Sequence, residues 1–510
     1  MTWLAPVLAI ETGLYLSAGF SWFRTQGYSF AEAGAAAIMA VFMVFSLIHQ
    51  IPAIVGVPLV GPILEAGLTA ALIYLSLRHR FWPLIKSGFT AILGLMHLET
   101  MSVGVLAATW GVMLVLILLG WLAPGGPFPW AAGVAKLPPG GLLSAVAGAP
   151  LTPLNSKALF YHCGRFGLSP GACGFGLLAH LAVGLSTYAL ARRYAWPPMA
   201  LTVTLLVVSM PRLVMLGLQP SAELIATAAV TVDLMLLYRL VEQHLPGDLA
   251  LFLLCTAFSI YVRPLSLGLA LVLVLLLLVV MVRRHGWIIR RELLAGRRRW
   301  AAVLLSLLFL AQVPVFGLNL AHGHPLFGTP HEFGGNGLLG AAVNLLRYLL
   351  LSIDPTEAVR RSFLWLTGID LAYLVAGIDS MAVAPLAAKA GVKALFTPIF
   401  TGGGGLGFGP FLPLLVMVAT VHALLRGPRR LKAVCVAWVG YLYLSAIVRA
   451  WQPDSLWVLT PLYAANGCLV AFFLPPYRLR RRGMRLLQSL SALLLFLSFY
   501  LALQVSAPIF

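Results

Sequence analysis

Long apolar runs, separated by short turns or basic clusters, make up most of the chain. Each run is apolar on all sides, whereas a helix of a soluble bundle keeps one polar face. A helix of about 20 apolar residues crosses the hydrocarbon core of a bilayer, and about fourteen runs approach that length. The pattern therefore predicts an all-α, polytopic membrane protein with about fourteen transmembrane helices. The predicted spans lie near residues 4–22, 33–54, 58–77, 103–122, 173–192, 198–216, 222–240, 248–262, 266–282, 301–318, 409–425, 433–450, 456–474 and 486–505.

Basic residues predict how these spans are oriented. Lys and Arg cluster on alternate connections, and such clusters mark the cytoplasmic side of membrane proteins. This rule places both termini on the outer side, together with two long segments at residues 121–171 and 319–408. The basic clusters lie at residues 78–86, 192–193, 283–299, 426–432 and 478–485.

Composition agrees with a membrane location. Hydrophobic residues make up 61% of the chain and charged residues only 10%, whereas a soluble domain carries about 25% charged residues. The net charge of +19 sits largely in the clusters beside the spans, where it suits anionic lipid headgroups. The sequence lacks the aromatic-interleaved basic patch of a nucleic-acid binder, so no nucleic-acid partner is expected. The first run has no basic start and no small-residue cleavage site, so we expect no signal peptide.

Changes in composition divide the sequence into three parts. Residues 1–102 form an N-terminal unit of three apolar runs followed by an amphipathic stretch, residues 103–475 form a larger core, and residues 476–510 form a C-terminal transmembrane helix. Cys163 and Cys173 lie in or at the edge of the first outer segment. A disulfide is permitted there, but the spacing alone does not establish it.

Several charged side chains fall at or inside predicted helix ends. Ser221 and Glu223 begin a helix, where Glu223 either stabilises the helix start or takes part in function. Arg263 precedes Pro264 at the outer end of a span, as either a snorkelling anchor or a phosphate ligand. Asp233 lies in the middle of a span, where hydrogen bonding to a neighbouring helix and a functional role are both open. The acids of the N-terminal unit, Glu11, Glu65 and Glu99, match no motif.

Short motifs in a characteristic order resemble those of the GT-C superfamily, whose members are polytopic glycosyltransferases that use polyprenyl-phosphate sugars. The family includes protein mannosyltransferases and lipid A aminoarabinose transferases. The resemblance covers about residues 103–475, by the order of the motifs and the predicted topology. The motifs are Pro150-Leu-Thr-Pro153, Cys163-Gly-Arg-Phe-Gly167, Leu190-Ala-Arg-Arg193, Pro211 with Pro220-Ser-Ala-Glu223, Arg263-Pro264, Gly407-Phe-Gly-Pro410 and Trp451-Gln-Pro-Asp-Ser-Leu-Trp-Val-Leu-Thr-Pro461.

The resemblance implies a GT-C-like fold in the bacterial inner membrane. It implies transfer of a sugar from a polyprenyl-phosphate carrier to an acceptor on the outer, periplasmic face, with membrane lipids around the protein. In the family, the first outer loop usually carries an Asp or Glu that acts as base or orients a metal or the acceptor. The matching segment here, residues 121–171, contains no carboxylate; it offers Lys136, Asn155, Lys157, His162 and Arg165.

Two acids elsewhere are the candidates for the catalytic base. Glu332 follows His331 in the second outer segment, near His322 and His324, where it acts as base, binds a divalent metal, or is simply solvated. Asp454 follows a span end, and it serves as base or in a local ion pair or helix cap. We assign no metal ligands and leave the cofactor open, with a divalent metal as the one considered.

Basic residues on the predicted outer side are candidate ligands of the lipid phosphate, because Arg binds phosphate oxygens bidentately. The orientation rule would otherwise deplete that side of Arg, although snorkelling to headgroups accounts for any single one. With Glu223, the predicted substrate-binding residues are Arg263, Arg212, Arg449, Lys157 and Arg165.

Two other classes of function stay open. A non-catalytic GT-C-like subunit of a larger membrane complex, with protein partners, is favoured by the acid-free first segment. A lipid-linked glycan transporter would need a continuous polar path, which the few charges within the spans disfavour.

Overall fold

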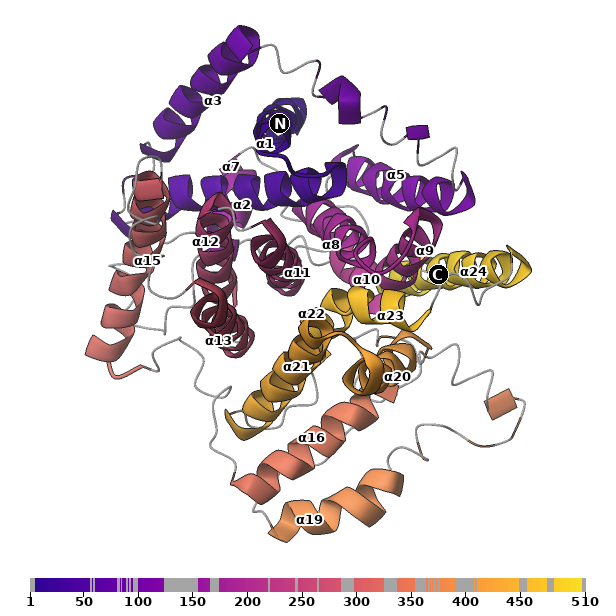
Figure 1. Ribbon diagram of the computed structural model, residues 1–510. Coiled ribbons are helices and arrows are strands. Elements are labelled where there is room, and N and C mark those ends of the chain that lie inside the picture. Colours follow the sequence, from indigo (N-terminus) through magenta and orange to yellow (C-terminus); the bar gives the residue numbers. More distant parts are fainter. Residues whose placement is uncertain are drawn as a thin grey trace. The chain divides into compact units, whose positions relative to one another are not determined.

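The computed structural model of the chain is drawn in Figure 1. It describes residues 5–55, 57, 60–79, 83, 85–88, 90, 93–94, 100–122, 155–165, 174–218, 221–243, 246–263, 266–285, 298–324, 337–353, 364–365, 367, 369, 373, 377–389, 408, 411–448, 456–474 and 481–506. These residues contain no β-strand, so the all-helical prediction is confirmed for the described part of the chain.

The chain forms two units, each described here by itself. The first combines Met1–Leu190 with Leu216–Pro330, and the second combines Ala191–Met215 with His331–Phe510. The boundaries that composition suggests, near residues 102 and 475, stay a prediction. The helices of the first unit are α1 (Ala5–Thr25), α2 (Phe30–Val55), α3 (Val60–His79), α5 (Thr100–Leu122), α7 (Asn155–Arg165), α8 (Phe175–Ala191), α11 (Ala222–Gln243), α12 (Pro246–Val262), α13 (Ser266–His285) and α15 (Arg298–Ala321).

The second unit is also helical. It begins with α9 (Pro197–Val208) and the start of α10 (Pro211–Leu218) and continues after the first unit is complete. Its remaining helices are α16 (Leu338–Ile353), the π-helical turn η5 (Asp379–Val383), α19 (Ala384–Lys389), α20 (Phe411–Arg426), α21 (Arg429–Val448), α22 (Leu456–Ala465), α23 (Gly467–Phe473) and α24 (Arg481–Ser506).

Apolar helices in both units indicate a membrane protein. Within the described residues, four helical stretches are long and apolar enough to cross a membrane: Phe30–Gln50, Ala222–Gln243, Arg429–Val448 and Arg482–Tyr500. Shorter apolar helices coincide with several other predicted spans, among them Val60–Leu75, Phe175–Ala191 and Gly247–Val262. The figure of about fourteen spans stays a prediction.

The predicted span at residues 198–216 is bent. Its two halves, α9 and α10, meet at an angle of 69° around Met210 and Pro211. Proline lacks the N–H that would continue the helical hydrogen bonds, and its ring clashes with the preceding turn. Together the halves are apolar enough to count as a fifth candidate span.

Helix α2 lies at the centre of the first unit. It contacts α1, α3, α7, α11, α12 and α15, and Figure 1 shows α1, α7 and α12 beside it. Small residues allow the close approach, as is common between helices in membranes. A Cβ placed on Gly19 of α1 would lie 3.3 Å from the Ala37 Cβ of α2.

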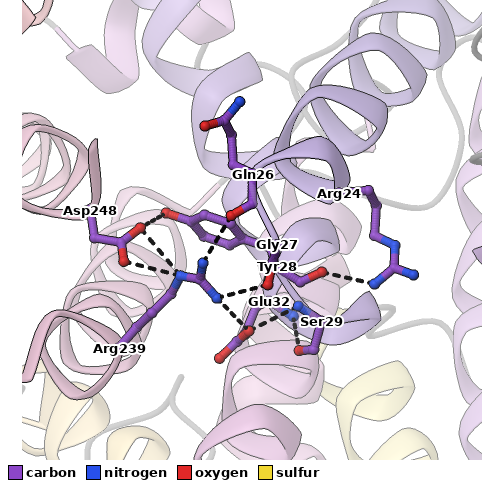
Figure 2. A network of polar contacts seen from close by, with 8 residues as sticks. All are labelled: Arg24, Gln26, Gly27, Tyr28, Ser29, Glu32, Arg239 and Asp248. Atoms are coloured by element: carbon purple, nitrogen blue, oxygen red, sulfur yellow. Dashed lines mark hydrogen bonds and ion pairs between the residues drawn. The ribbon is translucent and has the colours of Figure 1, made fainter. Parts of the chain in front are cut away.

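One end of this bundle is tied together by the buried guanidinium of Arg239 on α11 (Figure 2). Its Nε lies 3.1 Å from Asp248 Oδ2 on α12, and its Nη1 lies 3.2 Å from Glu32 Oε2 on α2. The same group donates to the carbonyl oxygens of Gln26 and Gly27, each at 3.2 Å. Arg239 therefore joins the α1–α2 turn to the turn between α11 and α12.

Tyr28 completes this network. The Arg239 guanidinium carbon lies 3.7 Å from the centre of its ring, and its hydroxyl donates to Asp248 Oδ1. Burial, reinforced by the Asp248 carboxylate, raises the pKa of Tyr28 well above its ordinary value, so the phenol stays protonated and donates. Ser29 and Glu32 form a capping box at the start of α2: Ser29 N donates to Glu32 Oε2 at 3.0 Å, and Glu32 N donates to Ser29 Oγ at 3.4 Å.

The second unit has its own buried polar contacts. Arg347 Nε on α16 donates to Asp379 Oδ1 in η5 at 3.1 Å, and both side chains are buried. The hydroxyl of Tyr463 on α22 donates to Ser352 Oγ on α16. Asn344 Nδ2 donates to the Ala446 carbonyl oxygen on α21 at 3.1 Å. Such contacts align α16 with α21 and α22, because buried polar groups are stable when their hydrogen bonds are made.

Candidate functional site

Four titratable side chains from four helices meet at the end of the first unit opposite Arg239. Glu11 comes from α1, His49 from α2, Glu65 from α3 and His162 from α7, and all four are buried. Buried carboxylates among apolar helices are costly unless they are paired or bind a cation. The group is therefore the leading candidate for a functional site.

Three atoms of this group form a small triangle. His49 Nε2 lies 2.9 Å from His162 Nδ1, Glu65 Oε2 lies 3.2 Å from His49 Nε2, and the same oxygen lies 3.5 Å from His162 Nδ1. A proton on one nitrogen can point along only one edge of the triangle. The three atoms thus converge on a common point, where a cation would interact with all of them.

Glu11 lies on the other side of the His162 ring. Its Oε2 is 4.0 Å from His162 Nε2, and its Oε1 accepts a hydrogen bond from Thr69 Oγ1 at 3.1 Å. The Tyr15 hydroxyl lies 3.2 Å from the same Thr69 oxygen. Glu11 is therefore held in place by α3, with one oxygen turned toward His162.

Helical spacing explains how α2 and α7 present these groups. On α7, Asn155, Ala158, Leu159 and His162 fall on one buried face at steps of three and four residues. On α2, Phe45 lies one turn before His49, and its ring stacks on that of His162 with a centroid distance of 4.3 Å. This stacking fixes the plane of the His162 ring.

The buried amide of Asn155 fixes the start of α7. Its Nδ2 donates to the Phe258 carbonyl oxygen on α12 at 2.9 Å. Its Oδ1 accepts from Ser46 Oγ at 3.1 Å, from Gln312 Nε2 on α15 at 3.3 Å, and from Gln50 Nε2. Asn155 thus links four helices two turns before His162, and it holds His162 against α2.

The two polar centres of this unit are separated along α2. Glu32 belongs to the Arg239 network and His49 to the cluster, and the helix rises about 25 Å from one residue to the other. That length approaches the roughly 30 Å of a hydrocarbon core. The predicted topology assigns the cluster end to the outer side and the Arg239 end to the cytoplasm, and this orientation stays a prediction.

Three of the predicted site residues lie outside the described residues: the candidate bases Glu332 and Asp454, and Arg449. The last residue of α7, Arg165, has a described backbone but no described side chain. Their predicted roles remain hypotheses. The Cys163–Cys173 question likewise falls outside the described side chains.

Two predicted residues do come together. Arg263, at the end of α12, has its Nη1 3.7 Å from Glu223 Oε2 at the start of α11. A quarter of the Arg263 side chain is exposed, and Glu223 is buried. Ser221 Oγ accepts from Leu224 N at 3.2 Å, so Ser221 caps α11 and Glu223 lies in its first turn. Glu223 therefore both lies in the first turn of α11, where a carboxylate stabilises the helix start, and forms an ion pair with Arg263.

The remaining described candidates lie apart from this pair. Lys157 is half-buried on α7, and its burial lowers the pKa of its ammonium group below the ordinary value. Arg212 is buried on α10, where its Nε donates to Thr460 Oγ1 at 3.2 Å within the second unit. Asp233, in the middle of α11, accepts from Thr256 Oγ1 of α12 at 3.3 Å, which is the hydrogen bond between helices that its position allows.

Reasoning from sequence missed the four residues of the cluster as a site. The available signal was polarity within apolar runs: Ser46, His49 and Gln50 form a polar stripe on a predicted span, and Glu11 and Glu65 interrupt the neighbouring spans. A comparison of the sequence with known protein families and with curated proteins found no match. The functional assignment therefore depends on the site itself and on the motifs of the core.

Proposed function

We propose that the protein is an integral membrane glycosyltransferase. It would take a sugar from a polyprenyl-phosphate carrier and pass it to an acceptor hydroxyl on the outer face of the membrane. The GT-C-like order of motifs over residues 103–475 and the apolar helices support this proposal. The assignment to a bacterial inner membrane belongs to the same proposal.

One observation carries the proposal: the acid-free first outer segment has carboxylates beside it in space. Helix α7 belongs to that segment, and it brings His162 to 3.5 Å from Glu65 and to 4.0 Å from Glu11. The N-terminal helices α1 and α3 would thus provide the acids that GT-C enzymes carry in their first loop. This arrangement supports an enzyme over a non-catalytic subunit.

The cluster would take up the proton in the reaction. The acceptor oxygen attacks the anomeric carbon, the bond from that carbon to the phosphate oxygen breaks, and its electron pair leaves with the lipid phosphate. The proton of the acceptor hydroxyl passes to the carboxylate of Glu65 in the His–Glu cluster. Proton transfer of this kind contributes about 10²–10⁴ to a rate, provided that base and hydroxyl come within about 3 Å.

Among the described cations of the first unit, Arg263 is the proposed ligand of the phosphate. It lies five residues beyond Phe258 on α12, which corresponds to about 7.5 Å along the helix. The Phe258 carbonyl oxygen is the one that Asn155 binds. This hydrogen bond therefore joins α12, whose end carries Arg263, to α7, which carries His162.

Reconstitution tests the proposal. The full-length protein in liposomes that contain polyprenyl-phosphate sugars should release free polyprenyl phosphate, and release should require an acceptor. A non-catalytic subunit would show no release with any carrier, and a transporter would move the intact lipid-linked sugar across the bilayer without cleaving it. Either outcome would overturn the enzyme proposal.

A further inference from the structure

We propose that His49, Glu65 and His162 bind one divalent transition-metal ion of the Zn²⁺ class and leave an open coordination position. The proposal concerns binding itself, so it is tested without any transfer reaction. Within the described residues, these three side chains are the group whose ligand atoms all lie within 4.8 Å of one another.

The triangle of ligand atoms has the dimensions of a tetrahedral site. Its sides are 2.9, 3.2 and 3.5 Å, whereas ligands about 2.1 Å from a tetrahedral Zn²⁺ are about 3.4 Å apart. An ion about 2.1 Å from all three atoms would sit about 1 Å out of their plane, close to the roughly 0.7 Å of a regular tetrahedron. Small shifts of the side chains would complete the site.

The kinds of ligand select the metal. Two imidazole nitrogens and one carboxylate suit Zn²⁺ and its first-row neighbours, whereas Mg²⁺ and Ca²⁺ prefer oxygen ligands alone. Structural zinc sites have four protein ligands, whereas catalytic sites have three and keep one position for water or substrate. The three ligands found here correspond to the catalytic type. The open position would accept an oxygen of water, of the acceptor or of a phosphate.

Glu11 would act as a positioning residue for His162. With the metal at His162 Nδ1, the proton of the ring sits on Nε2, and that atom faces Glu11 Oε2 at 4.0 Å. Carboxylates behind metal-bound histidines fix the ring and its tautomer. Thr69 holds Glu11 from α3. The carboxylates of Glu11 and Glu65 also balance the two charges of the ion, which lowers the cost of burying all three.

Calorimetry on the full-length protein in detergent tests the site. After chelator treatment, titration with ZnCl₂ should show one ion per chain with a dissociation constant below about 1 µM, and MgCl₂ should bind far more weakly. His162→Gln and His49→Gln should each weaken Zn²⁺ binding at least about 100-fold. The control His422→Gln, on α20 of the second unit, should bind as the wild type does.

Two results would overturn the metal site: no saturable Zn²⁺ binding by the wild type, or unchanged binding in both His49→Gln and His162→Gln. Binding without transfer would instead overturn the proposed function and leave the metal site standing. Glu11→Gln should keep one ion per chain but weaken binding about 10-fold and shift the visible absorption of a Co²⁺-loaded sample. An unchanged affinity and spectrum would reject the positioning role of Glu11.

Discussion

His49 Nε2 lies 2.9 Å from His162 Nδ1, although 113 residues separate the two histidines in the chain. The first belongs to an apolar helix that is long enough to span a membrane, and the second belongs to a short helix in the predicted first outer segment. Their contact brings that segment against the acids of the N-terminal helices. The N-terminal unit, which matches no motif, thereby becomes part of the proposed reaction site.

Asn155 should be needed for stability as well as for placing His162. Asn155→Ala removes a side chain that bonds to four other residues and leaves buried polar groups without partners, each costing about 1–3 kcal/mol. We expect a loss of about 2–4 kcal/mol in detergent-based unfolding. Gln243→Ala, at the exposed end of α11, is the control and should change little. Equal stability of the two variants would contradict the role of this amide.

Replacing Arg239 alone should lower the stability of the protein more than replacing it together with its partners Glu32 and Asp248. Arg239→Met leaves Glu32 and Asp248 buried without their shared cation, and breaking such a pair costs about 3–5 kcal/mol. Adding Glu32→Gln and Asp248→Asn removes the stranded charges, so the triple variant should regain part of the loss. Unfolding of the single and triple variants measures this difference, with exposed Arg429→Met as the control. A triple variant that is less stable than Arg239→Met would refute the interpretation.

Glu223 should compete with phosphate for Arg263. The Glu223 carboxylate lies 3.7 Å from the Arg263 guanidinium, and a partly exposed pair of this kind is worth up to about 1 kcal/mol. Glu223→Gln should therefore strengthen binding of a short-chain isoprenyl phosphate about 2- to 5-fold. Arg263→Lys should weaken it, because an ammonium group cannot bind two phosphate oxygens as a fork. If phosphate affinity is the same in both variants, Arg263 is not the ligand.

Labelling of single cysteines should reveal the predicted orientation. Gln26→Cys, in the α1–α2 turn, should react with a membrane-impermeant reagent only from the cytoplasmic side, and His322→Cys only from the outer side. Both positions are exposed. The native Cys255, Cys435 and Cys468 are buried and free, which lowers the background, and Cys163 and Cys173 would be replaced by Ser. The reverse pattern of labelling would invert the topology and place the cluster on the cytoplasmic side.

Helices were predictable where one long apolar run carries the signal. The run predicted at residues 222–240 is the observed helix Ala222–Gln243, and its start follows from Ser221. The bend in the run at 198–216 also has a visible cause in Pro211, although the apolar pattern alone predicts one span there. These features depend on neighbours in the chain, so local reasoning reaches them.

The candidate site was not predictable in the same way. Its four titratable residues come from four helices, and each of them alone fits a buried polar residue with an ordinary hydrogen bond. The pairing of helices depends on close contacts between small residues, such as Gly19 against Ala37, and on the hydrogen bonds of Asn155. No spacing in the sequence encodes these pairings. The sequence could show that Glu11 and Glu65 are unusual, but not that they meet.

Sugar transfer by Glu65→Gln is the decisive test of the His–Glu cluster as the reaction centre. The variant keeps the size of the side chain and one acceptor oxygen, and it removes the charge from the triangle with His49 and His162. The matched control is Glu242→Gln, the same change at the exposed end of α11. In liposomes with a polyprenyl-phosphate sugar and an acceptor, we expect a rate on the order of 100-fold below wild type for Glu65→Gln and a wild-type rate for Glu242→Gln. Equal rates for the two variants, in protein that folds normally, would contradict the assignment of the His–Glu cluster as the reaction centre.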